Sequence, residues 1–401
     1  MAKKTINKEL TGAQDLYNFL FEACNIIRGP VSQDNFKDYI TPLLYYKRIS
    51  DVYDEETEEA LISSGGDKEY ASLPEQHRFV IPDGCHWQEV RERTENLGAA
   101  IVGAMRQIEI ANPDTLYGVL SMFSSQKWTN KAILNDSKIR DLIEHLSKRK
   151  LGNKDYPADL MGDAYEILLK KFADDSKAQA GEFYTPRSVV RLLVHILDPQ
   201  PGETVYDPAC GSGGMLIEAI RYMHDDSLCC GSIFGQEKNV VNAAIAKMNL
   251  FLHGASDFNV MQGDTLRDPK ILQGGNIAKF DCVIANPPFS LENWGATEWS
   301  SDKYKRNIYG TPSDSCGDYA WIQHMICSMS SGKGRMAVVM PQGILFRGNQ
   351  EAEIRKQLVE SDLIEAVVTL GDKLFYGTGL SPCFLIIRRH YCPLKMDGVK
   401  N

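Results

Sequence analysis

The residues best suited to chemistry follow a short apolar segment. Cys282 to Ala285 is predicted to be a buried strand, and the next residues are Asn286, Pro287, Pro288 and Phe289. Neither proline can donate a hydrogen bond, and each restricts the residue before it to extended geometry, so this backbone is stiff. A side-chain carbonyl, a fixed backbone carbonyl and an aromatic face could hold a flat ring and aim its amino group at an electrophile. The alternative is a Pro-Pro turn in front of a core phenylalanine.

A glycine-rich loop upstream predicts a cradle for an anionic group. A strand at Val205-Tyr206 leads to Asp207, and a helix from Met215 to Met223 opens after Gly211, Ser212, Gly213 and Gly214. Glycines let backbone amides approach a ligand closely, and a helix N-terminus favours a carboxylate or similar anion. The spacing fits neither the dinucleotide fingerprint nor a P-loop. We therefore predict a different nucleotide-type cradle, with a purely structural loop as the alternative.

Carboxylates stand at the ends of the next two predicted strands. Glu237 follows Ile233-Phe234, and Asp264 follows Val260-Met261. In doubly wound folds an acid at the second strand accepts hydrogen bonds from ribose hydroxyls, and Asp264 could accept from an adenine amino group. Either residue alone is more often a surface carboxylate. Together with Asp207 they place acids at three consecutive strand ends, which predicts a nucleoside-binding edge.

Alternating short strands and helices from Thr204 onward predict the sheet that positions these residues. The alternation favours a parallel-type sheet with helices on both faces, an α/β fold. Before it, Thr185 is predicted to cap a helix at Ser188 to Leu197, with Pro186 as the first helical residue. The remaining strands are predicted at 336–340, 364–369 and 384–387.

The first part of the chain is predicted to be an all-α domain, residues 1–155, followed by a second domain at 156–401. Apolar residues recur at helical spacing over 16–27, 36–53, 101–108 and 139–146. No catalytic constellation occurs there, which favours a role in docking to subunits or DNA.

Composition bounds the class of protein. The 401 residues are 43% hydrophobic and 24% charged, with no long uncharged apolar stretch, which predicts a cytoplasmic globular protein without a membrane span. Ten scattered cysteines without CxxC pairs or partner histidines predict reduced core thiols and no metal site. A net charge of −9 argues against a surface that grips nucleic acid everywhere, so a partner should supply much of any DNA contact.

The segment 290–315 is predicted to be loop-like. Its aromatic and basic residues suit DNA contact, although a mobile polar loop is an equal alternative. They are Trp294, Trp299, Lys303, Tyr304, Lys305 and Arg306.

In combination, these motifs resemble those of S-adenosylmethionine-dependent methyltransferases that act on the N6 atom of adenine in DNA. The GEFYTP segment at 181–186, the IRG and YYKRISDVYDEE segments near the start, and IPDGCHW at 81–87 extend the resemblance to the modification subunits of type I restriction–modification systems. The resemblance covers roughly residues 12 to 390 and implies a Rossmann-like methyltransferase domain after an all-α domain.

The resemblance also implies roles for particular residues. Asp207 and the loop Gly211, Ser212, Gly213 and Gly214 would position the amino acid moiety of S-adenosylmethionine, Glu237 its ribose and Asp264 its adenine. Asn286 and the Pro287 carbonyl would accept hydrogen bonds from the target amine within the Asn286-Pro287-Pro288-Phe289 motif, with Phe289 stacked on the base. The methionine end of the cofactor would lie against Glu182, Phe183, Tyr184, Thr185, Pro186 and Arg187.

The implied partners are double-stranded DNA, a specificity subunit that chooses the target, and a restriction subunit with translocase and nuclease activity. Two modification subunits per specificity subunit are expected. Family members usually continue after the last strand with a helical tail, whereas this sequence ends at Asn401. Two alternatives stay open: a methyltransferase acting on RNA or on a protein amide, and a cofactor-binding scaffold without turnover.

Overall fold

The computed structural model describes residues 2–116, 118–120, 128–157, 160–165, 167–168, 185–223, 231–255, 257–371 and 382–389. By its internal contacts the chain divides into two compact units. A helical unit consists of residues 1–180 and 247–254, and a sheet unit of residues 181–246 and 255–401. None of the described helices is both long and apolar enough to cross a membrane.

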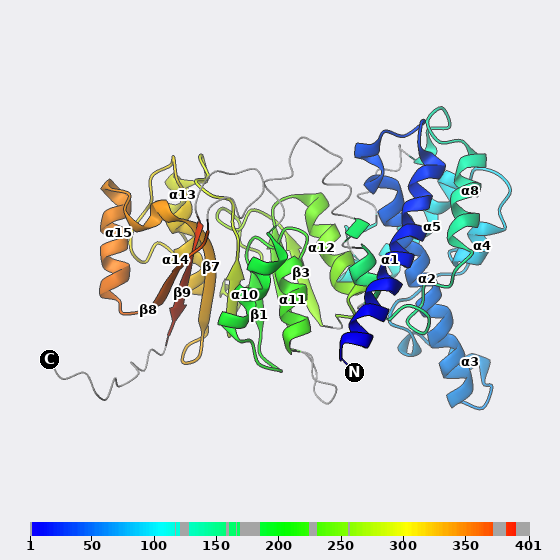
Figure 1. Ribbon diagram of the computed structural model, residues 1–401, viewed down its shortest axis with the longest axis horizontal. Helices are drawn as coiled ribbons and strands as arrows, with labels where there is room; N and C mark the ends of the chain where they lie inside the picture. The colour runs from blue at the N-terminus through cyan, green and yellow to red at the C-terminus, as the bar shows by residue number, and fades with distance from the viewer. Residues whose placement is uncertain are drawn as a thin grey trace. The chain divides into compact units, whose positions relative to one another are not determined.

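The helical unit is built on four longer helices, as the apolar spacing predicts (Figure 1). They are α1 (Ala2–Ile27), α2 (Lys37–Ser63), α5 (Leu97–Ala111) and α8 (Asp136–Leu146), joined by the short helices α3 (Lys68–Ala71), α4 (Trp87–Arg91) and α6 (Pro113–Leu116). Helix α8 packs on α1, where the His145 ring stacks on Phe19 at a centroid distance of 4.5 Å. Apolar residues on the facing sides of these helices are almost fully buried and form the core of the unit.

A buried arginine fastens the chain after α8 onto α2. The Arg48 guanidinium donates to the carbonyls of Leu151 and of Tyr156, the latter at 2.9 Å. Two turns further along α2, the Glu55 carboxylate accepts from the backbone N–H groups of Asn153 at 2.6 Å and of Lys154 at 3.1 Å. Because a buried charge needs polar partners, Arg48 is stable there only while residues 151–156 stay folded against it.

Seven of the described strands in the sheet unit form one sheet, in the order β3-β2-β1-β6-β7-β9-β8. The bounds are β1 (Val205–Asp207), β2 (Ile233–Glu237), β3 (Phe258–Gln262), β6 (Cys282–Ala285), β7 (Arg335–Pro341), β8 (Ile364–Thr369) and β9 (Pro382–Arg388). All seven predicted strands are confirmed. The five neighbouring strands β3, β2, β1, β6 and β7 pair in parallel. Strand β9 runs antiparallel to both of its neighbours, β7 and β8. The sheet is therefore mixed, and the prediction of a parallel-type sheet was wrong for its last strand.

Helices cover both faces of this sheet (Figure 1). Helices α10 (Arg187–Leu197) and α11 (Gly214–Met223) pack against each other and against β1, β6 and β7. On the other face, alternate residues such as Tyr206, Val283 and Met336 form one core with α14 (Asp318–Ser328) and with Ile354 and Leu358 of α15 (Asn349–Glu360). This alternation follows from the two-residue period of a strand.

The strand order reverses between β1 and β6, which are parallel neighbours. Crevices at such a reversal, outside the carboxyl ends of the strands, are where open α/β sheets bind ligands. Asp207 ends β1 and Asn286 directly follows β6, so the two motifs predicted to do chemistry meet at this point.

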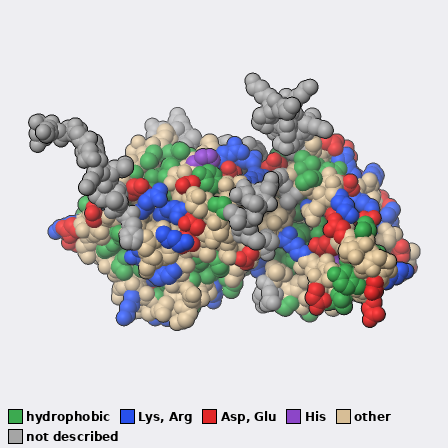
Figure 2. All heavy atoms as spheres, turned by 90° about the horizontal axis from the view of Figure 1, so that it is seen from below, with side chains coloured by type: hydrophobic (Ala, Val, Ile, Leu, Met, Phe, Trp, Pro, Cys, Tyr) green, Lys and Arg blue, Asp and Glu red, His purple; other side chains and the backbone are tan. Residues whose placement is uncertain are grey.

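The visible surface carries both signs of charge. Figure 2 shows Lys and Arg side chains interspersed with Asp and Glu, and hydrophobic side chains in small groups. This mixture agrees with a protein that does not grip nucleic acid over its whole surface.

Candidate active site

The loop after β1 is shaped by glycine and by one buried carboxylate. Asp207 is 2% exposed, and its Oδ1 accepts from the backbone N–H of Ala209 at 2.9 Å. Gly211 and Gly213 have φ angles of +54° and +85°, which L side chains adopt only with strain. The Gly213 N–H donates to the Cys210 carbonyl at 2.8 Å, and helix α11 begins at the next residue. The loop therefore turns sharply and presents the start of α11 at the sheet edge.

Glu237 joins the end of β2 to this glycine loop. Its Oε2 accepts from the Gly211 N–H at 3.0 Å, and its Oε1 accepts from the Asn239 N–H at 2.7 Å. The carboxylate has about four acceptor positions and three backbone N–H partners, those of Gly211, Asn239 and Lys238, so one position remains to accept from a ribose hydroxyl. The loop lies tightly on β2, since a Cβ at Gly235 would come within 3.0 Å of Cys210 Sγ.

Burial changes the protonation of both acids. Burial raises the pKa of Asp207 to about 8; the Ala209 N–H opposes this shift, and the nearby Glu237 charge adds to it. Burial also raises the pKa of Glu237, against the backbone N–H groups of Asn239, Gly211 and Lys238. The pair thus favours ligand groups that donate hydrogen bonds or carry positive charge.

Asp264 already has partners for both of its carboxylate oxygens. Oδ1 accepts from the N–H groups of Leu266 and Arg267, both at 3.2 Å, and Oδ2 lies 2.9 Å from Lys238 Nζ. The Lys238 side chain is 70% exposed and can leave without structural cost, so Asp264 can exchange this partner for a ligand.

Asn286 and Thr185 form a hydrogen bond that the sequence did not predict. Asn286 Nδ2 donates to Thr185 Oγ at 2.8 Å, and the Asn286 Oδ1 atom is buried with no partner among the described residues. The prediction that Thr185 caps α10 was wrong, because Pro186 is the N-cap and Arg187 the first helical residue. Thr185 instead fixes the amide so that an acceptor is left for another molecule.

The three residues that follow Asn286 in the motif differ from one another in exposure. Pro287 is buried, Pro288 is exposed and Phe289 is half-buried. The residue after it, Ser290, donates its backbone N–H to Asp318 Oδ1 at 2.7 Å, and Arg347 lies beside both. The sequence resemblance implies that residues 317–321 border the target-base pocket, but it assigns no catalytic role to Asp318. It does not identify Arg347, and an acidic residue in the first turn of α14 was the available signal for Asp318.

The segment 290–315 is mostly structural rather than a DNA-contacting loop. Trp294 and Trp299, the latter within α13 (Ala296–Ser300), are each 2% exposed, and Arg306 is 1% exposed. Arg306 forms a two-pronged pair with Asp302 and donates to the carbonyls of Thr265 and Leu266 at 2.8 and 2.7 Å. The prediction that these three residues contact DNA was wrong, while Lys303 and Lys305 remain exposed.

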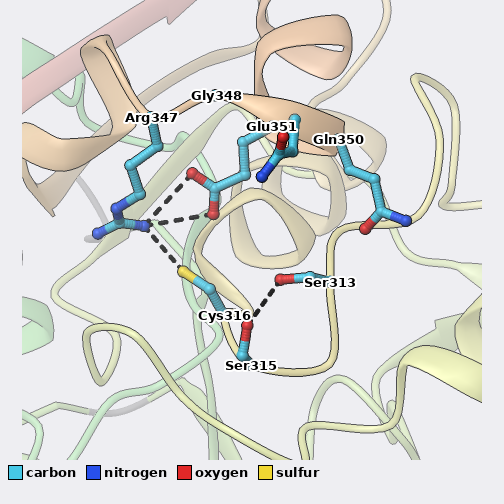
Figure 3. A pocket seen from close by; sticks show the side chains of 8 residues that line it. Ser313, Ser315, Cys316, Arg347, Gly348, Gln350 and Glu351 are labelled. Carbon is cyan, nitrogen blue, oxygen red and sulfur yellow. Dashed lines mark hydrogen bonds and ion pairs between the residues drawn. The ribbon is translucent and has the colours of Figure 1, made fainter.

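A pocket of about 300 Å³ lies near the start of α15 (Figure 3). Its polar lining includes Arg347, Glu351 and Cys316, and Figure 3 shows the guanidinium of Arg347 directed at the other two. The residues predicted to bind the cofactor do not line it.

Three predicted site residues, Glu182, Phe183 and Tyr184, lie outside the described residues. Within the described part of the chain, no group of three or more His, Cys, Asp or Glu side chains could hold a metal. The described cysteines are free thiols, mostly buried, as predicted.

The fold and these strand ends define an α/β methyltransferase preceded by a helical domain. Comparison with known proteins gives the same result in more detail. Residues 156–397 match the model of the N-6 DNA Methylase family, and residues 16–146 match the HsdM N-terminal domain. The chain belongs to the N-6 DNA Methylase family, so the family predicted from the sequence is confirmed.

Individual relatives are methylase subunits. The chain is 34% identical over 366 residues to the type I restriction enzyme MjaVII methylase subunit of Methanocaldococcus jannaschii, a match that covers 86% of this chain and 60% of that protein. It is 27% identical over 385 residues to the EcoKI methylase subunit of Escherichia coli, covering 91% and 65%. The chain thus spans less than two thirds of the length of these two relatives.

The fold has also been seen in a solved structure. The type I restriction-modification system methyltransferase subunit from Streptococcus thermophilus superimposes with a TM-score of 0.78 at 26% identity, covering 95% of this chain and 85% of that one.

Proposed function

We propose that this protein transfers a methyl group from S-adenosylmethionine to N6 of adenine in double-stranded DNA, as the modification subunit of a type I restriction–modification complex. One observation carries the proposal: Asn286 presents a buried amide oxygen without a partner among the described residues, at the carboxyl end of the strand beside β1. Such an atom is costly to leave unpaired, so it favours a ligand that brings an N–H group.

The chemistry of the target explains why an amide suits this position. An adenine amino group is a poor nucleophile because its lone pair is delocalised into the ring. Acceptors on its two N–H bonds, Asn286 Oδ1 and the Pro287 carbonyl, favour a pyramidal nitrogen whose lone pair points away from them. An amide oxygen stays neutral, which avoids a buried negative charge beside the reacting atoms. Rate enhancement then comes from positioning and electrostatics.

The target base must leave the duplex to reach this site. Stacking of the half-buried Phe289 on the flipped base would offset about 1–3 kcal/mol of that cost. The nitrogen forms its bond to the methyl carbon as the carbon–sulfur bond breaks, and the proton lost from nitrogen passes to solvent.

The residues at the sheet edge fit S-adenosylmethionine. When bound, it supplies an electrophilic methyl group on a sulfonium. Gly211 and Gly213 leave room at the start of α11, Glu237 keeps an acceptor position for a ribose hydroxyl, and Asp264 can exchange Lys238 for an amino group. Residues 182–187 would complete the methionine end of this site.

The proposed partners follow from the family. A separate specificity subunit would choose the DNA sequence, two copies of this chain would join it, and a restriction subunit would add cleavage, all in the cytoplasm. The helical unit supports this proposal, since residues 16–146 match the HsdM N-terminal domain.

The decisive experiment maps 6-methyladenine by single-molecule sequencing in cells that carry this gene with its neighbouring specificity gene. A parallel culture carries Asn286→Ala. We expect one split sequence motif to be modified in the first culture and unmodified in the second. If the complex assembles and binds cofactor but neither culture contains 6-methyladenine, the adenine proposal is wrong, and RNA or protein amides become the substrates to test.

A further inference from the structure

Ser290, the residue directly after Phe289, is held in an unusual conformation by two distant side chains. Its φ angle is +50°, in the left-handed region that non-glycine residues adopt only at a cost. Its backbone N–H donates to Asp318 Oδ1 at 2.7 Å, and its Oγ accepts from Arg347 Nη2 at 3.3 Å. The chain therefore reverses direction at a point that both side chains determine.

Asp318 and Arg347 also bind each other. Asp318 is fully buried in the first turn of α14, and its Oδ2 accepts from Arg347 Nη1 at 2.7 Å. Arg347 comes from the connection between β7 and α15 and is held in turn by Glu351, with Nη1 and Oε1 3.3 Å apart (Figure 3). Ser290, Asp318 and Arg347 thus close a triangle of hydrogen bonds between three segments of the sheet unit.

The triangle fixes the backbone after Pro288, in a segment whose other torsion angles are already restricted. The rings of Pro287 and Pro288 fix their φ angles, and β6 fixes the preceding residues. The direction of the Pro287 carbonyl and the position of the Phe289 ring therefore depend on how the chain leaves Pro288. With β6 anchored at one end and Ser290 at the other, the segment between them has one favoured path.

We propose that Asp318 and Arg347 are positioning residues for methyl transfer, which set the Pro287 carbonyl and the Phe289 ring against the target adenine. The inference rests on the proposed function and deepens it. Neither residue needs to touch the cofactor or the base. Their removal should reduce the rate of transfer within the bound complex and leave cofactor binding at β1 and β2 intact.

An arginine at the other end of β7, the strand that precedes Arg347 in the chain, provides a matched control. Arg335 begins β7 at the opposite end, pairs with Glu203 at 2.6 Å and is 7% exposed. It donates to the carbonyls of Leu197, at 2.6 Å, and of Asp198, and among the described residues its side-chain hydrogen bonds all lie far from residues 286–290 in the sequence. Arg335→Gln therefore tests what the loss of a buried ion pair does to the sheet alone.

The test uses the assembled complex with its specificity subunit. Single-turnover methyl transfer, cofactor binding by calorimetry and base flipping, reported by 2-aminopurine at the target position, are measured for Arg347→Gln, Arg347→Lys, Asp318→Asn and Arg335→Gln. All assays are run at a temperature at which every variant is folded. We expect Arg347→Gln to slow transfer by about 10- to 100-fold, with cofactor affinity changed less than about twofold. Arg347→Lys and Asp318→Asn should each lose less of the rate than Arg347→Gln does. Arg335→Gln should keep the wild-type rate despite a lower Tm.

Two outcomes would overturn the inference. One is an unchanged transfer rate in Arg347→Gln. The other is an equal loss of rate in Arg347→Gln and Arg335→Gln. That result would mean that both ion pairs act only by stabilising the fold. Failure of the proposed function is separate, because it would show as absence of adenine methylation by the wild-type complex itself.

Discussion

The amide of Asn286 is oriented by Thr185, whose Oγ accepts from Nδ2 at 2.8 Å although 101 residues separate the two in the sequence. An amide has a donor end and an acceptor end, and this bond occupies the donor end. The acceptor end is then left for the substrate. The threonine of the segment predicted to bind the cofactor is thus in contact with the residue predicted to bind the base.

We expect Thr185→Val to lower the single-turnover rate of methyl transfer roughly tenfold, since loss of one hydrogen bond is worth about 1.4 kcal/mol. Thr185→Ser keeps the hydroxyl and should keep most of the rate, whereas Asn286→Ala should abolish transfer and retain cofactor binding. Equal rates for Val and wild type would show that the amide is oriented in another way.

Gly213→Ala should weaken S-adenosylmethionine binding. The φ angle of +85° strains any L residue by about 1–2 kcal/mol, and a Cβ would meet Ala246 at 3.4 Å, so relaxation would tilt the start of α11. Gly66 is a matched control in the helical unit, with φ at +98° and nothing within 4 Å. Calorimetry should give a Kd for S-adenosylmethionine that is at least tenfold higher in Gly213→Ala and unchanged in Gly66→Ala. The two variants should lose a similar amount of Tm. Equal affinity in the two variants would contradict this assignment of the loop.

Asp207→Asn should change how stability depends on pH. The folded pKa is about 8 and the unfolded value about 3.9, so the folded state holds a proton that the unfolded state releases between these values. This contribution is complete below pH 4 and is lost as pH rises through 8.

The measurement is urea unfolding at pH 5, 7 and 8.5. Wild type should lose more stability across this range than Asp207→Asn, which has no proton to release. The exposed cap residue Asp67 gives the control Asp67→Asn, which should follow wild type. An equal loss of stability in Asp207→Asn and wild type would mean that the carboxyl is already ionised in the folded protein across this pH range.

Arg306→Met should destabilise the sheet unit and leave the salt dependence of DNA binding unchanged. Its removal takes the guanidinium away from two backbone carbonyls and from the Asp302 carboxylate, which keeps the backbone N–H of residue 306; breaking a buried pair costs about 3–5 kcal/mol. Chemical denaturation measures this loss. Lys154→Ala, which breaks exposed pairs with Glu58 and Glu59, should cost far less stability, because solvent screens such pairs. A smaller salt slope for DNA binding in Arg306→Met would restore the DNA-contact interpretation.

The strands of the sheet were predictable because each is an apolar run bounded by turn residues. The direction of the strands was harder to predict, because the apolar run at 382–387 is equally compatible with parallel and antiparallel pairing. The small hairpin of β4 (Leu272–Gln273) and β5 (Asn276–Ile277) was missed, although Gly274-Gly275 between two short runs is a known turn signal.

At the site, residues fixed by local pattern were predictable and residues fixed by long-range contact were not. Strand ends place Asp207, Glu237 and Asn286 at one edge without knowledge of the third dimension. Thr185 and Arg347 act through partners far away in the sequence, which no local spacing reveals. Arg306 was misjudged because aromatic and basic composition resembles a DNA-contacting loop, whereas Asp302 four residues earlier was the signal for an internal pair.

The antiparallel strand β9 has a consequence for synthesis of the protein. Strand β8 pairs only with β9, and β9 lies between β8 and β7. During translation, strands β1 to β7 can join the sheet as they emerge, but β8 has no neighbour until β9 follows it from the ribosome. The edge that carries Asn286 can therefore be complete before β8 has a strand to pair with. A ribosome that stalls after β8 would leave a formed active-site edge together with an unpaired strand.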